Sequence, residues 1–110
     1  MAPNPLLSQP PADAEARLVA AAVAGDDRAF AELADRHRAV VLAHCRRILG
    51  AGPDAEDAVQ EALVRAWRRR AGFEGRSSFR WWLLRIATNT CTDIGRRTTR
   101  SPGARRFDGD

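Results

Sequence analysis

Glycine and proline constrain the fold of this chain more than any other feature. Most of them lie near the two ends or in two interior clusters, at residues 50–53 and 72–75. The tracts between these clusters are long, contain no proline and are rich in alanine. Because glycine and proline are the residues that interrupt helices, such tracts favour long helices. No segment shows the alternating polar and apolar pattern that is typical of a strand.

The apolar residues of these tracts recur at the spacing of one helix face. The pattern predicts helices over residues 13–24, 27–49 and 54–70, and a fourth that runs to about Arg97. Residues that can cap a helix stand at the start of each tract: Asp13, Asp26 or Asp27, Asp54, and Ser77 or Ser78. Asp57 would complete a capping box in the third helix. We therefore predict an all-α fold, a compact bundle of about four helices.

The length of 110 residues is enough for one small domain. We expect residues 1–12, which are rich in proline, to form a disordered leader, residues 13–98 to form the helical domain, and residues 99–110 to form a linker. No tract is long and apolar enough to cross a membrane. The start lacks the pattern of a secretory signal, which favours the cytoplasm.

Charge is distributed unevenly along the chain. Residues 1–62 hold six arginines and ten acidic residues, whereas residues 63–110 hold twelve arginines and four acidic residues. Ordinary solvated helix faces are one explanation of such charges. A gradient from acidic to basic also indicates two surfaces, one for a protein partner and one for nucleic acid.

The residues that catalysis or metal binding would need are not grouped in a recognised motif. Two sets of metal-ligating side chains lie close in the sequence: His37, His44 and Cys45, and Asp54, Glu56 and Asp57. The first set lacks further ligands nearby, and helix capping and the helix dipole account for the second. Cys45 and Cys91 form no CxxC pair and suit half-buried positions in a reducing compartment. We expect no enzyme, no cofactor and no metal site.

Two adjacent tryptophans, Trp81 and Trp82, lie near the start of the fourth helix. Neighbouring helical residues point about 100° apart, so one core cannot accept both indoles. The apolar spacing assigns Trp82 to the core and Trp81 to the outer side. Arginines and polar side chains share that outer side, and basic groups beside aromatic faces are typical of single-stranded nucleic-acid binding. On the third helix, Val64 is an aliphatic residue in an otherwise polar face, which indicates a contact surface.

The segments "DAEDAVQEALVRAW" and "FEGRSSFRWWLLRIATNTCTDIGRR" resemble region 2 of bacterial RNA polymerase sigma factors of the extracytoplasmic-function (ECF) class. Both motifs occur in the family's order and at its usual separation, and the similarity covers about residues 26–100. The resemblance implies a transcription initiation factor domain. Its third helix would dock on the clamp helices of the largest subunit of core RNA polymerase, through Asp57, Gln60, Glu61 and Val64.

The resemblance also implies that the fourth helix and the loop before it recognise the promoter −10 element. They would hold unpaired, flipped-out bases of the non-template strand, at a cost of a few kcal/mol per base for unstacking. The residues at matching positions are Arg76, Ser77, Ser78, Arg80, Trp81, Arg85 and Asn89, with Arg96 and Arg97 on the backbone.

This sequence departs from the family pattern in three ways. Trp81 stands where relatives usually carry a small residue, and Leu84 replaces a frequent aromatic. The chain also ends where a linker should lead to a second helical domain, which reads the −35 element, and we expect that domain to be absent. The alternative function is a helical protein-interaction module, for example one that binds an anti-sigma factor, without autonomous DNA reading.

Overall fold

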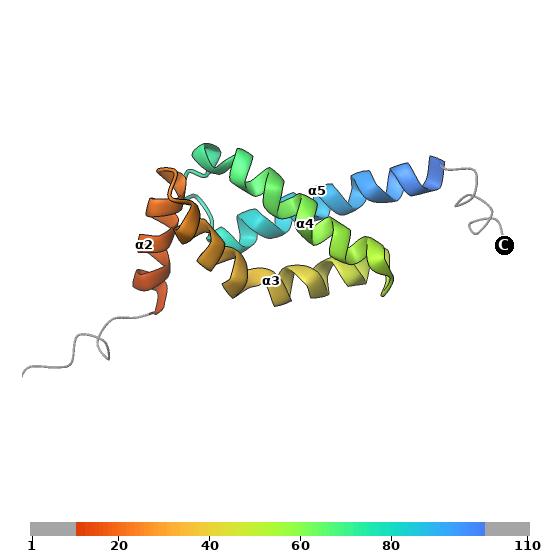
Figure 1. Cartoon of the computed structure of the whole chain (residues 1–110), viewed down its shortest axis with the longest axis horizontal. Coiled ribbons are helices and arrows are strands. Elements are labelled where there is room, and N and C mark those ends of the chain that lie inside the picture. Colours follow the sequence, from red (N-terminus) through yellow and green to blue (C-terminus); the bar gives the residue numbers. More distant parts are fainter. Residues whose placement is uncertain (1–10, 101–110) are drawn as a thin grey trace, which may run out of the picture.

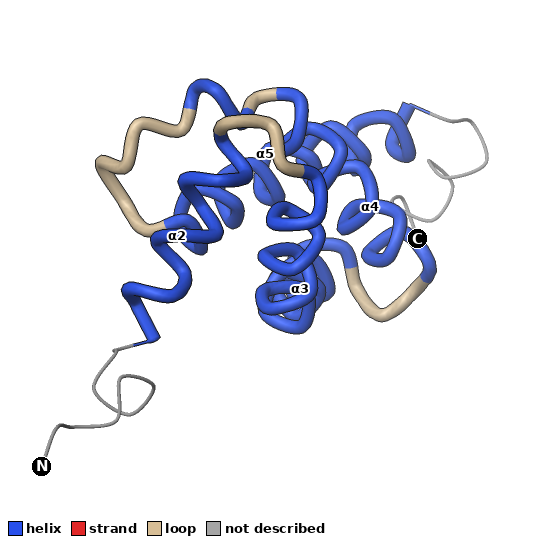
Figure 2. Tube along the Cα trace, turned by 60° about the vertical axis from the view of Figure 1, so that its left-hand side comes forward, coloured by secondary structure: helices blue, strands red, loops and turns tan. Residues whose placement is uncertain are grey.

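The computed structural model describes residues 11–100, with side chains described for residues 14–97. This part of the chain contains no strand and folds into long helices joined by short loops (Figures 1 and 2). The elements in chain order are α2 (Pro11–Val23), α3 (Asp27–Leu49), α4 (Pro53–Arg68), the 3-10 turn η1 (Arg70–Gly72) and α5 (Phe79–Arg100). The predicted all-α bundle of about four helices is confirmed.

Helices α3, α4 and α5 pack against one another and form the body of the bundle. Helix α2 lies at one end, at a steep angle to the others, where it packs on α3 and touches η1 (Figure 1). The opposite end of α5 extends beyond α3 and α4. The loop at residues 73–78 therefore lies at the α2 end of the bundle, where α5 begins.

Small side chains on α4 let the three central helices approach closely. The α4 alanines Ala55, Ala58, Ala62 and Ala66 are all fully buried. Larger apolar side chains from the neighbouring helices, including Leu33, Val41 and Leu83, fill the rest of the core. The alanine-rich stripe that helical spacing predicts on α4 is therefore an internal face. Ile48, which the same spacing places on the inner stripe of α3, is 45% exposed, so that prediction is wrong.

Two predicted caps are confirmed. The Asp26 carboxylate accepts hydrogen bonds from the backbone N–H groups of Arg28 and Ala29, at 3.0 and 3.2 Å. The Ser78 hydroxyl accepts one from the backbone N–H of Trp81 at 3.1 Å. These contacts satisfy donors that have no partner inside the first turn of α3 and of α5.

The predicted starts of the other two helices are wrong. Helix α2 begins at Pro11, so Asp13 lies inside it rather than at its cap. Helix α4 begins at Pro53 with Gly52 before it, and no side chain caps it, so neither Asp54 nor a capping box with Asp57 starts this helix. Proline suits the first helical position because it lacks an N–H group and its φ angle is already helical.

The two ends of the chain carry the remaining expectations. The predicted leader is described only from residue 11, where α2 begins, and the linker only up to residue 100. Their other residues lie outside the described part. Among the helices of residues 11–100, none is long and apolar enough to span a membrane.

Cys45 of α3 and Cys91 of α5 meet in the core. Both are free thiols with no exposed surface, more deeply buried than the sequence predicts. Burial raises the pKa of Cys45 to about 12, with a further contribution from the Cys91 thiol, and burial also raises the pKa of Cys91. In the part of the chain that has been placed, no three His, Cys, Asp or Glu side chains are grouped so that they could hold a metal ion.

We expect neither cysteine to react with iodoacetamide in native buffer at pH 8, because the thiolate is the reactive form and the reagent cannot reach either sulfur. Both should be alkylated in urea, which provides the control. The measurement is mass spectrometry of the intact chain over time. Alkylation of the native protein at the rate of a small-molecule thiol would contradict the burial of this pair.

Candidate nucleic-acid and protein-partner surfaces

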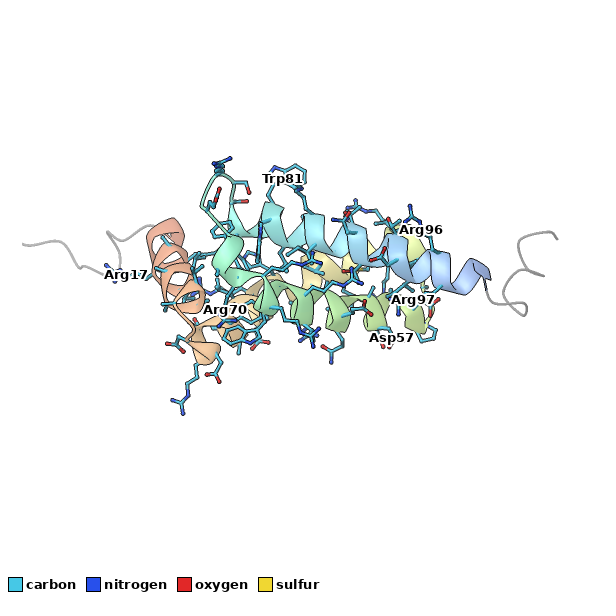
Figure 3. The ribbon with its side chains drawn as sticks, turned by 90° about the horizontal axis from the view of Figure 1, so that it is seen from above. Arg17, Asp57, Arg70, Trp81, Arg96 and Arg97 are labelled. Carbon is cyan, nitrogen blue, oxygen red and sulfur yellow. The ribbon has the colours of Figure 1, made fainter. Side chains whose placement is uncertain are left out.

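The tryptophan pair divides between core and solvent as predicted. Trp81 is 62% exposed, and its side chain projects from one edge of α5, away from the other helices (Figure 3). Trp82 is half-buried, with its ring centroid 5.3 Å from that of Phe73 and 5.5 Å from that of Phe79. Trp82 is thus part of the aromatic packing beneath the loop, while the Trp81 ring face is available to a ligand.

The loop at residues 73–78 is fixed at both ends and exposed between them. At its start, the Phe73 ring packs edge-on against Phe79, with centroids 5.9 Å apart. At its end, Ser78 caps α5. Gly75 has a φ angle of +78°, a conformation that favours glycine, and lets the chain turn between these anchors. The loop is therefore held against the bundle, and its polar residues face solvent.

The residues predicted to contact DNA are all exposed. Trp81, Arg85, Asn89 and Arg96 follow one another at helical spacing, so they lie along one side of α5. Trp81 and Arg96 project toward the same edge of the bundle (Figure 3). The loop brings Arg76, Ser77 and Ser78 to the start of that side. The structure thus groups these loop residues and these four α5 residues along one edge. Arg76 also forms an ion pair with Glu74 at 3.1 Å.

Arg80 is held differently from the other arginines of this set. Its Nε donates to Nδ1 of His37 at 3.4 Å, and His37 Nε2 donates to the Glu15 carboxylate at 3.0 Å. His37 is buried with both ring nitrogens bonded, so its role in this structure is to join neighbouring helices. The contacts link α2, α3 and α5. Sequence reasoning missed them because Glu15 and Arg80 lie far from His37 in the chain and no motif connects the three.

A groove of about 910 Å³ lies beside this contact, between α2, α3 and the start of α5. Its apolar walls come from α2, including Val19 and Val23, and from the rings of Phe73 and Phe79. Its charged groups come from Glu15, Arg36, Glu74 and Arg80. The groove therefore adjoins the inner side of the loop, whereas Trp81 projects from the outer side.

The predicted polymerase surface on α4 is only partly free. Asp57 and Gln60 are exposed, and Val64 is 47% exposed, which confirms an aliphatic side chain in a polar face. Asp57 lies on the opposite edge of the bundle from Trp81 (Figure 3). Glu61 differs from these three residues, because it is partly buried and bonded to arginines.

Glu61, Arg65, Asp93 and Arg97 form an ionic cluster between α4 and α5. Arg65 bridges the two acids, donating to Glu61 and, at 2.8 Å, to Asp93. Arg97 contacts both carboxylate oxygens of Glu61, at 3.1 and 3.2 Å. Burial alone would raise the pKa of Glu61, but hydrogen bonds from Arg97 and Arg65 outweigh it and lower that pKa. The hydrogen bond from Arg65 likewise lowers the pKa of Asp93. Both acids are therefore ionised at neutral pH.

Known proteins are similar to this chain in sequence and in fold. A family model described as sigma-70 region 2 matches residues 33–101. ECF RNA polymerase sigma factor SigG of Mycobacterium tuberculosis is 55% identical over 62 residues, covering 56% of this chain and 17% of SigG. RNA polymerase sigma factor CnrH of Cupriavidus metallidurans is 40% identical over 87 residues, covering 78% of this chain and 45% of CnrH.

Two solved structures agree. An engineered region 2 of sigmaE, in complex with GTAAAA, matches with a TM-score of 0.73 at 32% identity, covering 78% of this chain and 90% of that one. CnrH, in complex with the cytosolic domain of CnrY, matches with a TM-score of 0.64 at 39% identity, over 76% of this chain and 54% of that one.

The helical packing, the sequence relatives and the solved structures point to one class, the region 2 domains of bacterial sigma factors. The chain belongs to the sigma-70 region 2 family, and its relatives include ECF sigma factors, as the sequence resemblance predicts. It spans less than half the length of the curated relatives SigG and CnrH.

Proposed function

We propose that this chain acts in bacterial transcription initiation, binding core RNA polymerase and capturing unpaired non-template bases of a promoter −10 element. The observation that carries the proposal is the edge of α5 on which exposed Trp81 stands in line with arginines, next to an anchored polar loop. The complex of the related engineered region 2 with GTAAAA supports it. This function includes no catalytic or cofactor-dependent step. The protein would carry it out in the cytoplasm.

Binding of a single strand along this edge would combine two interactions. The arginines, including Arg76, Arg85 and Arg96, would neutralise phosphates and release counterions. Trp81 would stack on a base, and the polar loop at residues 73–78 would hold a flipped base. Together these contacts would offset the few kcal/mol that unstacking each base costs. Because Trp81 is already exposed, the protein would not need to unfold its core to present the ring.

The polymerase-binding part of the proposal rests on α4. Its exposed face combines Asp57 and Gln60 with the exposed side chain of Val64. An apolar side chain surrounded by polar groups is suited to the centre of a protein interface. Since α4 and the Trp81 edge face different directions, polymerase and DNA could be bound together.

Fluorescence anisotropy with labelled single strands tests the DNA-reading part. We expect the chain to bind GTAAAA more tightly than a scrambled strand of the same composition at low salt. Affinity should fall as salt rises, with a slope in log K of about −0.7 for each phosphate neutralised on a single strand. Equal affinity for both strands would contradict promoter-base recognition.

A second candidate function is binding of an anti-sigma factor without autonomous DNA reading. The related CnrH was solved in complex with the cytosolic domain of CnrY, which supports such a partner. The two functions separate in the same anisotropy experiment, because a module that only binds protein has no reason to prefer one strand over the other.

A further inference from the structure

The ionic cluster between α4 and α5 joins residues that the proposed function gives to different partners. Glu61 belongs to the polymerase-binding set on α4, and Arg97 to the DNA-backbone set on α5. In this structure they bond to each other, with Arg97 contacting both oxygens of the Glu61 carboxylate. While this bond is intact, the Glu61 carboxylate and Nη2 of Arg97 are engaged with each other and not with a partner.

We propose that the Glu61–Arg97 ion pair couples the two surfaces, so that binding of one partner releases the side chain that the other partner needs. The inference rests on the proposed function. When polymerase engages Glu61, Arg97 loses the acid to which it is hydrogen-bonded and can turn to a DNA phosphate. When DNA engages Arg97, Glu61 becomes available to polymerase. Each partner breaks the same contact, so the first to bind removes a cost that the second would otherwise meet, and the coupling is reciprocal.

Breaking the Glu61–Arg97 bond leaves no buried charge without a partner or solvent. Arg65 also contacts Asp93, so it keeps an acidic partner after Glu61 turns away. The Arg97 side chain is 59% exposed and can be solvated or reach a phosphate without crossing the core. Glu61 is more enclosed, with its side chain 34% exposed. Because water reaches it less easily, its carboxylate oxygens accept hydrogen bonds from Arg65 and Arg97 when no partner is bound. Arg97 is therefore the member of the cluster that can leave at the least cost.

Neutralising Glu61 by Glu61→Gln imitates the loss of its charge to a partner and needs no polymerase in the experiment. We expect Glu61→Gln to bind a single strand about two- to fivefold more tightly than the parent, the range that breaking a partly exposed ion pair allows. The slope of log K against log salt should steepen by about 0.7, the contribution of one additional phosphate contact on a single strand. Anisotropy titrations at several salt concentrations provide both quantities.

Glu56→Gln is the matched control. Glu56 lies on the same helix and the substitution removes the same charge, but the Glu56 side chain is 70% exposed and its ion pair is with Arg46 of α3. Equal tightening by Glu56→Gln and Glu61→Gln would overturn the proposal, because it would reduce the effect to net charge. A second test places Glu61→Gln in an Arg97→Gln background, where the gain should disappear. Persistence of the gain there would also overturn the coupling through Arg97.

The same titrations keep this inference separate from the proposed function. Sequence preference is read from GTAAAA against the scrambled strand, whereas the Glu61 effect is read on either strand, because phosphate contacts do not depend on base sequence. If preference is absent but the Glu61→Gln gain is present and requires Arg97, promoter reading fails and the Arg97 release stands. If preference is present and the gain is absent, the coupling fails and promoter reading stands.

Discussion

Replacing Trp82 by alanine should destabilise the domain strongly, while the same change at Trp81 should leave stability nearly unchanged and weaken DNA binding. Truncation at Trp82 removes half-buried aromatic surface from beneath Phe73 and Phe79. We expect a loss of about 2–4 kcal/mol in the free energy of unfolding, somewhat below the cost of a fully buried aromatic. Trp81→Ala should change that free energy by less than about 0.5 kcal/mol, since the side chain is largely in solvent.

Thermal melts followed by circular dichroism measure the stability, and anisotropy measures the DNA affinity. If Trp81 stacks on a base, its removal should cost about 1–3 kcal/mol of binding free energy. Trp81→Phe keeps an aromatic face and should recover part of that loss, which separates stacking from a general change in the helix. A larger drop in melting temperature for Trp81→Ala than for Trp82→Ala would show that the two faces are assigned the wrong way round.

Helical spacing was enough to assign these two faces because the period of an α-helix fixes side-chain direction regardless of what lies opposite. The same period predicts the apolar stripe on α4, and the cap at Ser78 follows from the preference for serine at helix starts. Ile48 shows the limit of that reasoning. It has the spacing of an inner residue but lies at the end of α3, where neighbouring helices do not cover all of it. Periodicity identifies a face and does not say how far the facing helix extends.

Contacts between helices could not be predicted from the sequence. The Glu61–Arg97 pair spans 36 residues and depends on how α4 crosses α5. The bond between Arg80 and His37 spans 43 residues and depends on where α5 begins relative to α3. Surface arginines look alike in a sequence. Which of them bond to acids or to His37 can be seen only once the packing of the helices is known. The site residues themselves remain predictions, supported by their exposure and by the relatives.

The second large effect is expected at Val64, the exposed aliphatic side chain of α4. Val64→Arg should weaken binding to core RNA polymerase by about tenfold or more, because it places a long charged side chain where an apolar contact is expected, near the centre of an interface. Arginine is a better helix former than valine, so the domain itself should not be destabilised. The measurement is retention of the chain on immobilised core polymerase over a range of concentrations, with circular dichroism to verify helicity.

Ile48→Arg is the matched control for this substitution. Ile48 and Val64 are exposed to nearly the same extent, 45% and 47%, but Ile48 lies on α3 and outside the predicted polymerase surface. If non-specific hydrophobic association of exposed aliphatic residues were responsible for polymerase binding, both variants would lose affinity equally. In that case α4 would have no special role. A loss confined to Val64→Arg would instead place the interface on α4. That face also carries Glu61, so docking there would disturb the acid that holds Arg97, and the same contact would reach the DNA-binding edge of α5.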